Sequence, residues 1–262
     1  MGEQSVNELK SSDWILAKPI AHRGLHDDSV PENSRAAFEA AIEAGYPIEI
    51  DVQLTKDKVP VVYHDDHLLR LTGLKKRVTK AMYNVVRQLK IADSEEDVPT
   101  FREVLDLVDG RVPLLIEIKR NKGSRGIERV VLEMLKDYKG EFAIQSFNPM
   151  ALRKVRKIDP SIYCGLLSSK LSEMKMLRIK KAAVRNARLF FLAKPDFVSF
   201  EINSFPNDRV KRFREELKLP IIGWTIKTKE DIERALEFCD GIIFENIENL
   251  RANFSGFVKT EA

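Results

Sequence analysis

The chain has 262 residues, of which 44% are hydrophobic and 32% charged, and its formal net charge is +4. This composition is typical of a soluble globular protein and excludes an extensively disordered chain. The 44 basic and 40 acidic side chains nearly balance, which gives no indication of nucleic-acid binding. The N-terminus lacks a signal-peptide pattern, and no segment has the ~20 apolar residues needed to cross a bilayer. We therefore expect a cytoplasmic protein with no transmembrane segment.

Short strand-like runs alternate with helix-like segments, a pattern typical of a parallel sheet built from βα repeats. The first run, 19–22, precedes a predicted helix at 34–44, whose apolar residues have helical spacing and which ends at Gly45. The further runs are 47–54, 112–118, 142–147, 162–167, 197–202, 220–226 and 241–244. Eight parallel strands close a (βα)8 TIM barrel, and about 250 residues is the usual length of that fold.

A ninth run, 59–63, follows the second barrel strand too closely for a parallel crossover, so we expect it to form a β-hairpin with that strand. Residues 66–98 show no clear strand, and a helix is predicted to begin near Thr100. The sequence thus predicts one TIM-barrel domain spanning 1–262, with the hairpin and a cap-like insertion at about 66–98 after the second barrel strand. The insertion is interpreted as a lid over the barrel mouth. The alternative is that it packs against the barrel and has no catalytic role.

Carboxylates lie at the ends of two predicted barrel strands, where such folds carry their chemistry. Glu49 and Asp51 are two residues apart on a strand, so both point to the same face, and Glu117 and Lys119 repeat this spacing. Buried carboxylates need a cation, and oxygen ligands suit Mg²⁺ or Ca²⁺ better than zinc. The alternatives are that Glu117 and Lys119 form a same-face ion pair, and that Glu49 and Asp51 pair with arginines.

His22 and His64 also end strand-like runs. Imidazole titrates near neutral pH, so a histidine pair beside a metal suggests a general acid and a general base. Arg23 and Lys119 can neutralise phosphate oxygens, and Arg23 can do so with two hydrogen bonds. The remaining histidines, His26 and His67, lie in the loop after the first strand and in the insertion.

The order of these motifs strongly resembles the glycerophosphodiester phosphodiesterase family over most of residues 18–250. The early motifs together are highly specific, whereas His-Arg-Gly alone would be weak evidence. The matching stretches are Ala21-His22-Arg23-Gly24, Pro31-Glu32-Asn33-Ser34, Glu49-Ile50-Asp51-Val52, Thr55-Lys56-Asp57, Val61-Val62-Tyr63-His64-Asp65, Leu69-Arg70-Leu71-Thr72-Gly73, Leu115-Ile116-Glu117-Ile118-Lys119, Ser146-Phe147 and Trp224-Thr225.

The resemblance implies a (βα)8 barrel that hydrolyses glycerophosphodiesters to glycerol 3-phosphate and an alcohol with a divalent metal. Mg²⁺ is the favoured ion, and Ca²⁺ and Mn²⁺ are the alternatives. Carried onto matching positions, the family's roles give metal ligands at Glu49, Asp51 and Glu117, acid and base at His22 and His64, and phosphate contacts at Arg23 and Lys119.

Three further positions are placed near the substrate by the same resemblance. Glu32 is expected near the site, while its neighbour Asn33 could instead cap the following helix. Phe147 and Trp224 would line the glycerol or alcohol pocket, with ordinary barrel packing as the alternative.

The family picture implies that the substrate's own glycerol hydroxyl attacks phosphorus, giving a cyclic phosphate that water then opens. Our hypothesis is that His22 activates this hydroxyl and His64 protonates the leaving oxygen. One departure concerns the last strand, where the family commonly has a Thr-Asp pair and this chain has Phe244-Glu245, so the substrate contact there is not carried over.

Two other readings of the function stay open at this point. One is a lysophospholipase D-type phosphodiesterase with peripheral membrane contact, to which a basic segment at 170–188 could contribute, although that segment also fits a solvated helix face. The other is a catalytically silent barrel that binds phosphodiesters or a protein partner. Cys164 and Cys239 lack metal-type spacing and are expected to be reduced structural thiols. The oligomeric state and the alcohol moiety do not follow from the sequence.

Overall fold

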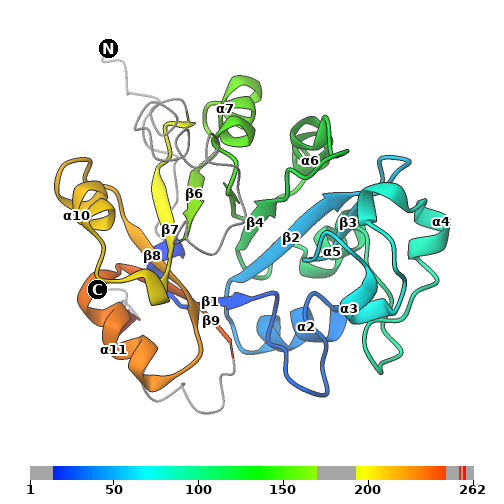
Figure 1. The fold of residues 1–262 in the computed structure, drawn as a ribbon, viewed down its shortest axis with the longest axis horizontal. Coiled ribbons are helices and arrows are strands. Elements are labelled where there is room, and N and C mark those ends of the chain that lie inside the picture. The colour runs from blue at the N-terminus through cyan, green and yellow to red at the C-terminus, as the bar shows by residue number, and fades with distance from the viewer. Residues whose placement is uncertain (1–13, 170–192, 246–253, 255, 258–262) are drawn as a thin grey trace.

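Eight parallel strands close into a barrel in the computed structural model, which describes residues 14–169, 193–245, 254 and 256–257 (Figure 1). The strands follow the order β1-β9-β8-β7-β6-β5-β4-β2, and β1 pairs with β2 to complete the ring. The predicted (βα)8 barrel is confirmed. The barrel strands are β1 (Ile20–His22), β2 (Ile48–Leu54), β4 (Leu114–Ile118), β5 (Phe142–Ser146), β6 (Cys164–Ser168), β7 (Phe197–Glu201), β8 (Ile221–Ile226) and β9 (Gly241–Phe244).

The predicted hairpin is also present, as β3 (Pro60–Val62). It pairs antiparallel with β2 and takes no part in the closed ring. Gln53 Nε2 donates to the backbone oxygens of Tyr63, His64 and Asp65 at 2.7, 3.1 and 2.8 Å, and these bonds fix the chain leaving the hairpin. His64 therefore enters the site from the hairpin, and not from a barrel strand.

The barrel interior has an apolar lower layer and a polar upper layer. The lower layer is a buried hydrophobic cluster, to which α1 (Trp14–Ala17) contributes Trp14 and Ile15. The barrel strands contribute Ile20, Leu115, Ala143, Phe197, Ile222 and Ile243 to this cluster. Side chains two positions apart on a strand share a face, so the next inward position on each strand lies one layer nearer the mouth. These positions hold His22, Glu117, Gln145, Ser199, Trp224 and Glu245. The alternation thus brings the polar groups of six strands to the carboxyl end of the barrel.

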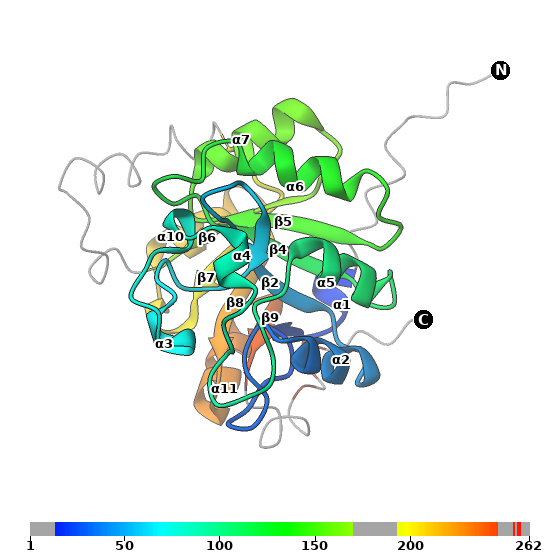
Figure 2. The same cartoon turned by 90° about the vertical axis from the view of Figure 1, so that its right-hand side faces the viewer.

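Helices cover the outside of the barrel (Figures 1 and 2). Ser34 caps α2 by accepting a hydrogen bond from the Ala37 amide at 3.1 Å, and Thr100 and Thr228 form capping boxes at α5 and α11. Asn33 thus does not cap α2, contrary to one of the two expectations for it. The helices are α2 (Arg35–Glu43), α5 (Phe101–Val108), α6 (Ile127–Leu135), α7 (Pro149–Ile158), α10 (Asp208–Glu215) and α11 (Lys229–Phe238), with a 3-10 helix η2 (Ile202–Ser204) after β7.

Residues 66–98 contain α3 (Leu69–Thr72), a 3-10 helix η1 (Val78–Lys80) and α4 (Tyr83–Val86). They build a separate hydrophobic cluster with the hairpin residues Val61 and Tyr63. The division of the chain into one domain with a cap stays a prediction, as does the lid function. The basic segment 170–188 lies outside the described residues. None of the helices within the described ranges is long and apolar enough to cross a membrane.

Candidate active site

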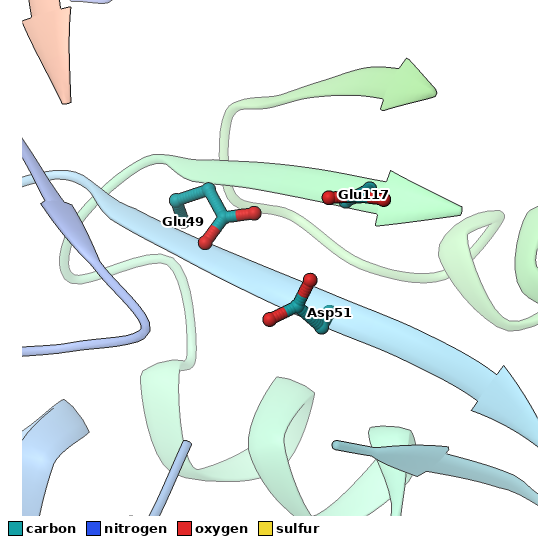
Figure 3. Close-up of side chains that lie close together, drawn as sticks. All are labelled: Glu49, Asp51 and Glu117. Carbon is teal, nitrogen blue, oxygen red and sulfur yellow. The ribbon is translucent and has the colours of Figure 1, made fainter. Parts of the chain in front are cut away.

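Glu49, Asp51 and Glu117 form a buried acidic cluster at the barrel mouth (Figure 3). Glu49 and Asp51 project from β2, and Asp51 stands directly opposite Glu117 of the neighbouring β4. One oxygen from each of the three carboxylates lies within 4.8 Å of the others. The strand register therefore produces the cluster predicted from the two-residue spacing.

The electrostatics of the cluster call for a positive charge. Burial, reinforced by the charge of Asp51, raises the pKa of Glu49 well above its usual range, and burial raises the pKa of Glu117 to about 7 despite the nearby Lys119. Asp51 is also buried, but Lys119 and Arg23 outweigh this effect and hold its pKa well below the ordinary value. The positive charges of Lys119 and Arg23 thus balance the charge of Asp51 but not that of Glu49.

The donor set fits a hard divalent cation. Glu49 Oε2 is buried and has no hydrogen-bond partner among the residues that the structure describes, so one oxygen of the cluster is available for a ligand. Carboxylate oxygens are the ligands preferred by Mg²⁺, Ca²⁺ and Mn²⁺. The residues present therefore fit the predicted metal.

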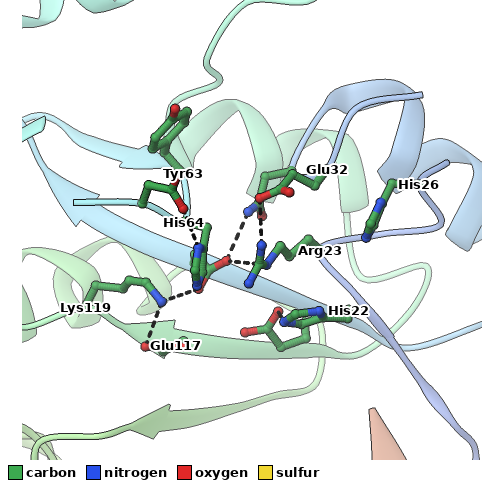
Figure 4. A network of polar contacts seen from close by, with 12 residues as sticks. His22, Arg23, His26, Glu32, Tyr63, His64, Glu117 and Lys119 are labelled. Atoms are coloured by element: carbon green, nitrogen blue, oxygen red, sulfur yellow. Dashed lines mark hydrogen bonds and ion pairs between the residues drawn. The ribbon is translucent and has the colours of Figure 1, made fainter. Parts of the chain in front are cut away.

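Lys119 and Arg23 border the cluster (Figure 4). Lys119 Nζ lies 2.9 Å from Asp51 Oδ1 and 3.1 Å from Glu117 Oε1. Arg23 Nε lies 3.3 Å from Asp51 Oδ2, and Arg23 Nη1 donates to Glu32 Oε1 at 2.7 Å. The same-face ion pair considered for Glu117 and Lys119 is present, and the phosphate contact of Lys119 stays a prediction.

A second arginine, Arg70 of α3, joins Glu32 to the hairpin. Its guanidinium donates to both Glu32 oxygens at 2.7 and 2.8 Å and to Asp65 Oδ2 at 2.7 Å. Glu32 thus touches Arg23 on one side and Arg70 on the other. Glu32 therefore lies beside Arg23, while a contact of Glu32 with the substrate stays a prediction.

The two predicted catalytic histidines each contact a carboxylate through Nδ1. His64 Nδ1 lies 2.8 Å from Asp65 Oδ1, and His22 Nδ1 contacts Glu245 Oε1. Burial and the positive charge of Arg23 lower the pKa of His22 to about 4, and burial lowers the pKa of His64 below its usual value. His22 Nε2 lies 3.8 Å from Glu49 Oε2, so this ring nitrogen faces the acidic cluster.

A cavity of about 140 Å³ opens beside the histidines, and aromatic residues form one wall of it. Phe147 and Trp224 meet edge to face, with ring centroids 5.6 Å apart. Phe147 is exposed, and within the described part of the chain the buried indole nitrogen of Trp224 has no hydrogen-bond partner. Both residues line the cavity together with His22, Arg23, Glu49, His64 and Glu117.

Several polar contacts of the site were not anticipated from the sequence. Gln145 Nε2 donates to Glu49 Oε1 at 3.3 Å, and Ser199 donates to Gln145 Oε1 at 2.9 Å. Asn33 Nδ2 donates to Asp51 Oδ2 at 3.0 Å. Gln145, Ser199 and Glu245 each lie two residues after an apolar residue that faces the barrel interior, and this spacing could have indicated that they face the interior too. Nothing in the local sequence indicated the contacts of Asn33.

The comparison with known proteins decides the family. The sequence profile described as glycerophosphoryl diester phosphodiesterase family matches residues 22–249. The chain belongs to this family. The enzyme class read from the motifs, a glycerophosphodiester phosphodiesterase, is thereby confirmed.

Individual relatives agree with the assignment. A glycerophosphodiester phosphodiesterase of Caldanaerobacter subterraneus subsp. tengcongensis is 34% identical over 88% of this chain and 95% of its own. A solved glycerophosphodiester phosphodiesterase from Thermotoga maritima is 27% identical, with a TM-score of 0.66 and coverage of 87% of this chain and 94% of its own. A phosphodiesterase from Oleispira antarctica, solved with its product sn-glycerol-3-phosphate, shares the fold at 24% identity and a TM-score of 0.71, covering 87% and 92% of the two chains.

Proposed function

We propose that the protein hydrolyses glycerophosphodiesters to glycerol 3-phosphate and an alcohol with a divalent cation held by Glu49, Asp51 and Glu117. The observation that carries the proposal is the acidic cluster itself, whose oxygens lie within 4.8 Å of one another beside His22. Product binding by the Oleispira antarctica phosphodiesterase supports glycerol 3-phosphate as the product class. Mg²⁺ is the first candidate ion, followed by Ca²⁺ and Mn²⁺.

The positive groups around the cavity suit a phosphodiester anion. When bound, the cation supplies Lewis-acid stabilisation of the phosphoryl oxygens and lowers the pKa of a hydroxyl group beside it. Arg23 is held by Glu32 and Asp51 with its guanidinium at the cavity wall, and Lys119 lies on the other side of Asp51. Both would bind phosphate oxygens and stabilise the negative charge that develops on them.

The histidines take complementary roles in this proposal. His22 is uncharged at neutral pH because its pKa is about 4, so its Nε2 can accept the proton of the attacking glycerol hydroxyl. His64 would protonate the leaving alcohol oxygen. Burial lowers the pKa of His64 below its usual value, while the charge of Asp51 and the hydrogen bond with Asp65 oppose this effect and favour the imidazolium that the role requires. This first step releases the alcohol and leaves a cyclic phosphate. Water would then open the ring, with the now neutral His64 taking a proton from the water and the protonated His22 returning its proton to the glycerol oxygen, which gives glycerol 3-phosphate and restores both histidines.

Phe147 and Trp224 would receive the glycerol or the alcohol moiety. Their rings offer an apolar face, and the unpaired indole N–H of Trp224 can donate to a substrate oxygen. The place of both residues in the cavity lining, beside the two histidines, supports these roles.

The decisive test is release of glycerol 3-phosphate from glycerophosphocholine and glycerophosphoethanolamine with Mg²⁺, Mn²⁺, Ca²⁺ or chelator. We expect cation-dependent release that Glu49→Ala abolishes. Glu133→Ala is the matched control, because Glu133 is exposed and pairs only with Lys136 in the described structure. Absence of release with every ion would contradict the proposal, and assays on lysophospholipid micelles would then separate the lysophospholipase D-type reading from a silent barrel.

A further inference from the structure

His22 and Glu245 come from opposite ends of the described chain and meet at the barrel mouth. β1 pairs in parallel with β9, with Ala21 opposite Phe244, so the residues that follow are neighbours across the sheet. His22 lies two positions beyond Ile20, and Glu245 two positions beyond Ile243, so both face the interior. The Glu245 amide donates to the Ile226 oxygen at 2.9 Å, which fixes the backbone from which this side chain projects.

Glu245 is a charged acceptor for the His22 ring. Burial raises its pKa, but the hydrogen bonds and charge of its histidine neighbours, above all His22, together with a hydrogen bond from Lys227, outweigh burial and hold the pKa well below the usual value. Lys227 Nζ lies 2.5 Å from Glu245 Oε2, while Glu245 Oε1 contacts His22 Nδ1. His26 Nε2 lies further away, 3.8 Å from Oε1.

An ionised carboxylate can only accept hydrogen bonds, so the contact with Glu245 requires a proton on His22 Nδ1. In a neutral imidazole the lone pair then resides on Nε2, the nitrogen that faces Glu49. His64 shows the same arrangement, because its Nδ1 contacts Asp65, which in turn is held by Arg70. Each histidine ring therefore contacts a carboxylate through Nδ1, and each of these carboxylates also contacts a positively charged side chain.

We propose that Glu245 is a positioning residue that holds His22 in the tautomer protonated at Nδ1, with an unprotonated Nε2 directed at the substrate. The proposal rests on the role of His22 as the base in the proposed function and adds the group that selects its reactive form. A carboxylate that fixes a histidine tautomer in this way is central to hydrolases with a Ser-His-Asp triad, where an amide in its place gives the wrong tautomer.

The test is ring ¹⁵N NMR of the full-length protein, for which four histidines give few signals, with His22→Asn to assign His22. In the wild type we expect a protonated Nδ1 and a bare Nε2 on His22. Glu245→Gln keeps the size of the side chain, but Lys227 attracts the amide oxygen and turns the NH₂ group toward His22 Nδ1. The variant should therefore carry the proton on Nε2, with kcat lowered about 100-fold or more and KM changed less than threefold.

The ranking of variants separates positioning from packing. Glu245→Ala removes the acceptor without imposing the wrong tautomer, so its loss of kcat should be smaller than that of Glu245→Gln, whereas a packing role predicts the reverse. Glu233→Gln is the matched control, because Glu233 is an exposed residue of α11 and is not one of the residues lining the cavity; its kcat should stay within about threefold of the wild type.

Three results would overturn the proposal: a wild-type His22 protonated at Nε2, a Glu245→Gln variant with kcat within threefold of wild type, or a loss of kcat with the tautomer unchanged. The NMR readout does not depend on turnover. Wild-type protein with the expected tautomer but without hydrolysis of any substrate would therefore refute the proposed function and leave the effect of Glu245 on His22 measurable.

Discussion

Lys119 Nζ lies 2.9 Å from Asp51 Oδ1, so Asp51 of the acidic cluster already has a counter-charge from the protein. Glu49 has a buried oxygen that no described residue hydrogen-bonds, and its pKa is raised by burial and by Asp51. The energetic benefit of a bound cation is therefore concentrated at Glu49. This asymmetry makes Glu49 the position at which cation binding can be tested separately from turnover.

We expect Mg²⁺, Ca²⁺ or Mn²⁺ to raise the melting temperature of the wild type. A ligand at 100 times its dissociation constant contributes about 2.7 kcal/mol, which corresponds to a shift of several degrees in a protein of this size. Glu49→Gln should abolish the shift, and Glu133→Gln should retain it. Differential scanning fluorimetry with and without chelator measures this, and an undiminished shift in Glu49→Gln would place the cation elsewhere.

The proposed acid role of His64 predicts a dependence on the leaving group. His64→Ala should lower kcat/KM by about 10²–10⁴-fold for a choline or ethanolamine ester, whose alkoxide needs a proton. A glycerophosphodiester with an acidic phenol as leaving group should lose less than about tenfold. The exposed His67 of the insertion provides the control His67→Ala. Equal losses on both substrates would count against His64 as the acid.

Gly24 directly follows His22 and Arg23 at the end of β1 and has φ of +83°. A Cβ at this position would lie 2.7 Å from the backbone carbonyl carbon of Ala37 in α2. Gly24→Ala should therefore lower the free energy of unfolding by at least about 2 kcal/mol, through backbone strain together with the clash. Gly73→Ala is a matched control, because Gly73 has φ of +72° but open space around it. Its cost should be about 1 kcal/mol, and urea denaturation compares the two.

The buried thiol of Cys239 predicts a loss of stability at alkaline pH. Burial, with a contribution from Asp240, raises the pKa of Cys239 from 9.0 to about 12. Between these values the unfolded chain releases the proton and the folded chain retains it, so the free energy of unfolding falls as pH rises, by about 1.4 kcal/mol per pH unit from this group. Below pH 9 the effect vanishes. Urea denaturation at pH 8 and 10.5 should show a smaller decrease for Cys239→Ala than for wild type, and identical decreases would exclude the thiol as the cause.

The strands of the barrel were predictable because each is a short apolar run in the sequence, and the observed strand covers nearly the same residues as the run. β2 (Ile48–Leu54) is buried along its whole length, and β3 follows it too closely for anything except a hairpin. The predicted bounds differ from the observed ones by a few residues at strand ends, where hydrogen bonding and not hydrophobicity sets the limit. The small cluster formed by residues 66–98 could not be derived, because its apolar residues are scattered over short helices without a continuous period.

The candidate site likewise has contacts that could be predicted from the sequence and contacts that could not. The sequence was sufficient to predict that Glu49, Asp51 and Glu117 lie close together, because the alternation of side chains along a strand and the position at a strand end are local properties. The pairing of His22 with Glu245 could not, because 223 positions separate them and only barrel closure makes β1 and β9 neighbours. Arg70 illustrates a further limit, since its contacts to Glu32 and Asp65 depend on how the insertion folds against the barrel.

His22 belongs to the ring of strands, whereas His64 is carried by the hairpin that continues into residues 66–98. The base and the acid of the proposed mechanism thus lie in separable parts of the chain. Substitutions that repack the small cluster around Val61 and Tyr63 can shift His64 and the adjoining wall while the strands that carry the carboxylates keep their register. In evolution or in the laboratory, the alcohol accepted by such an enzyme can accordingly diversify through this segment under constraints different from those on the chemistry at phosphorus.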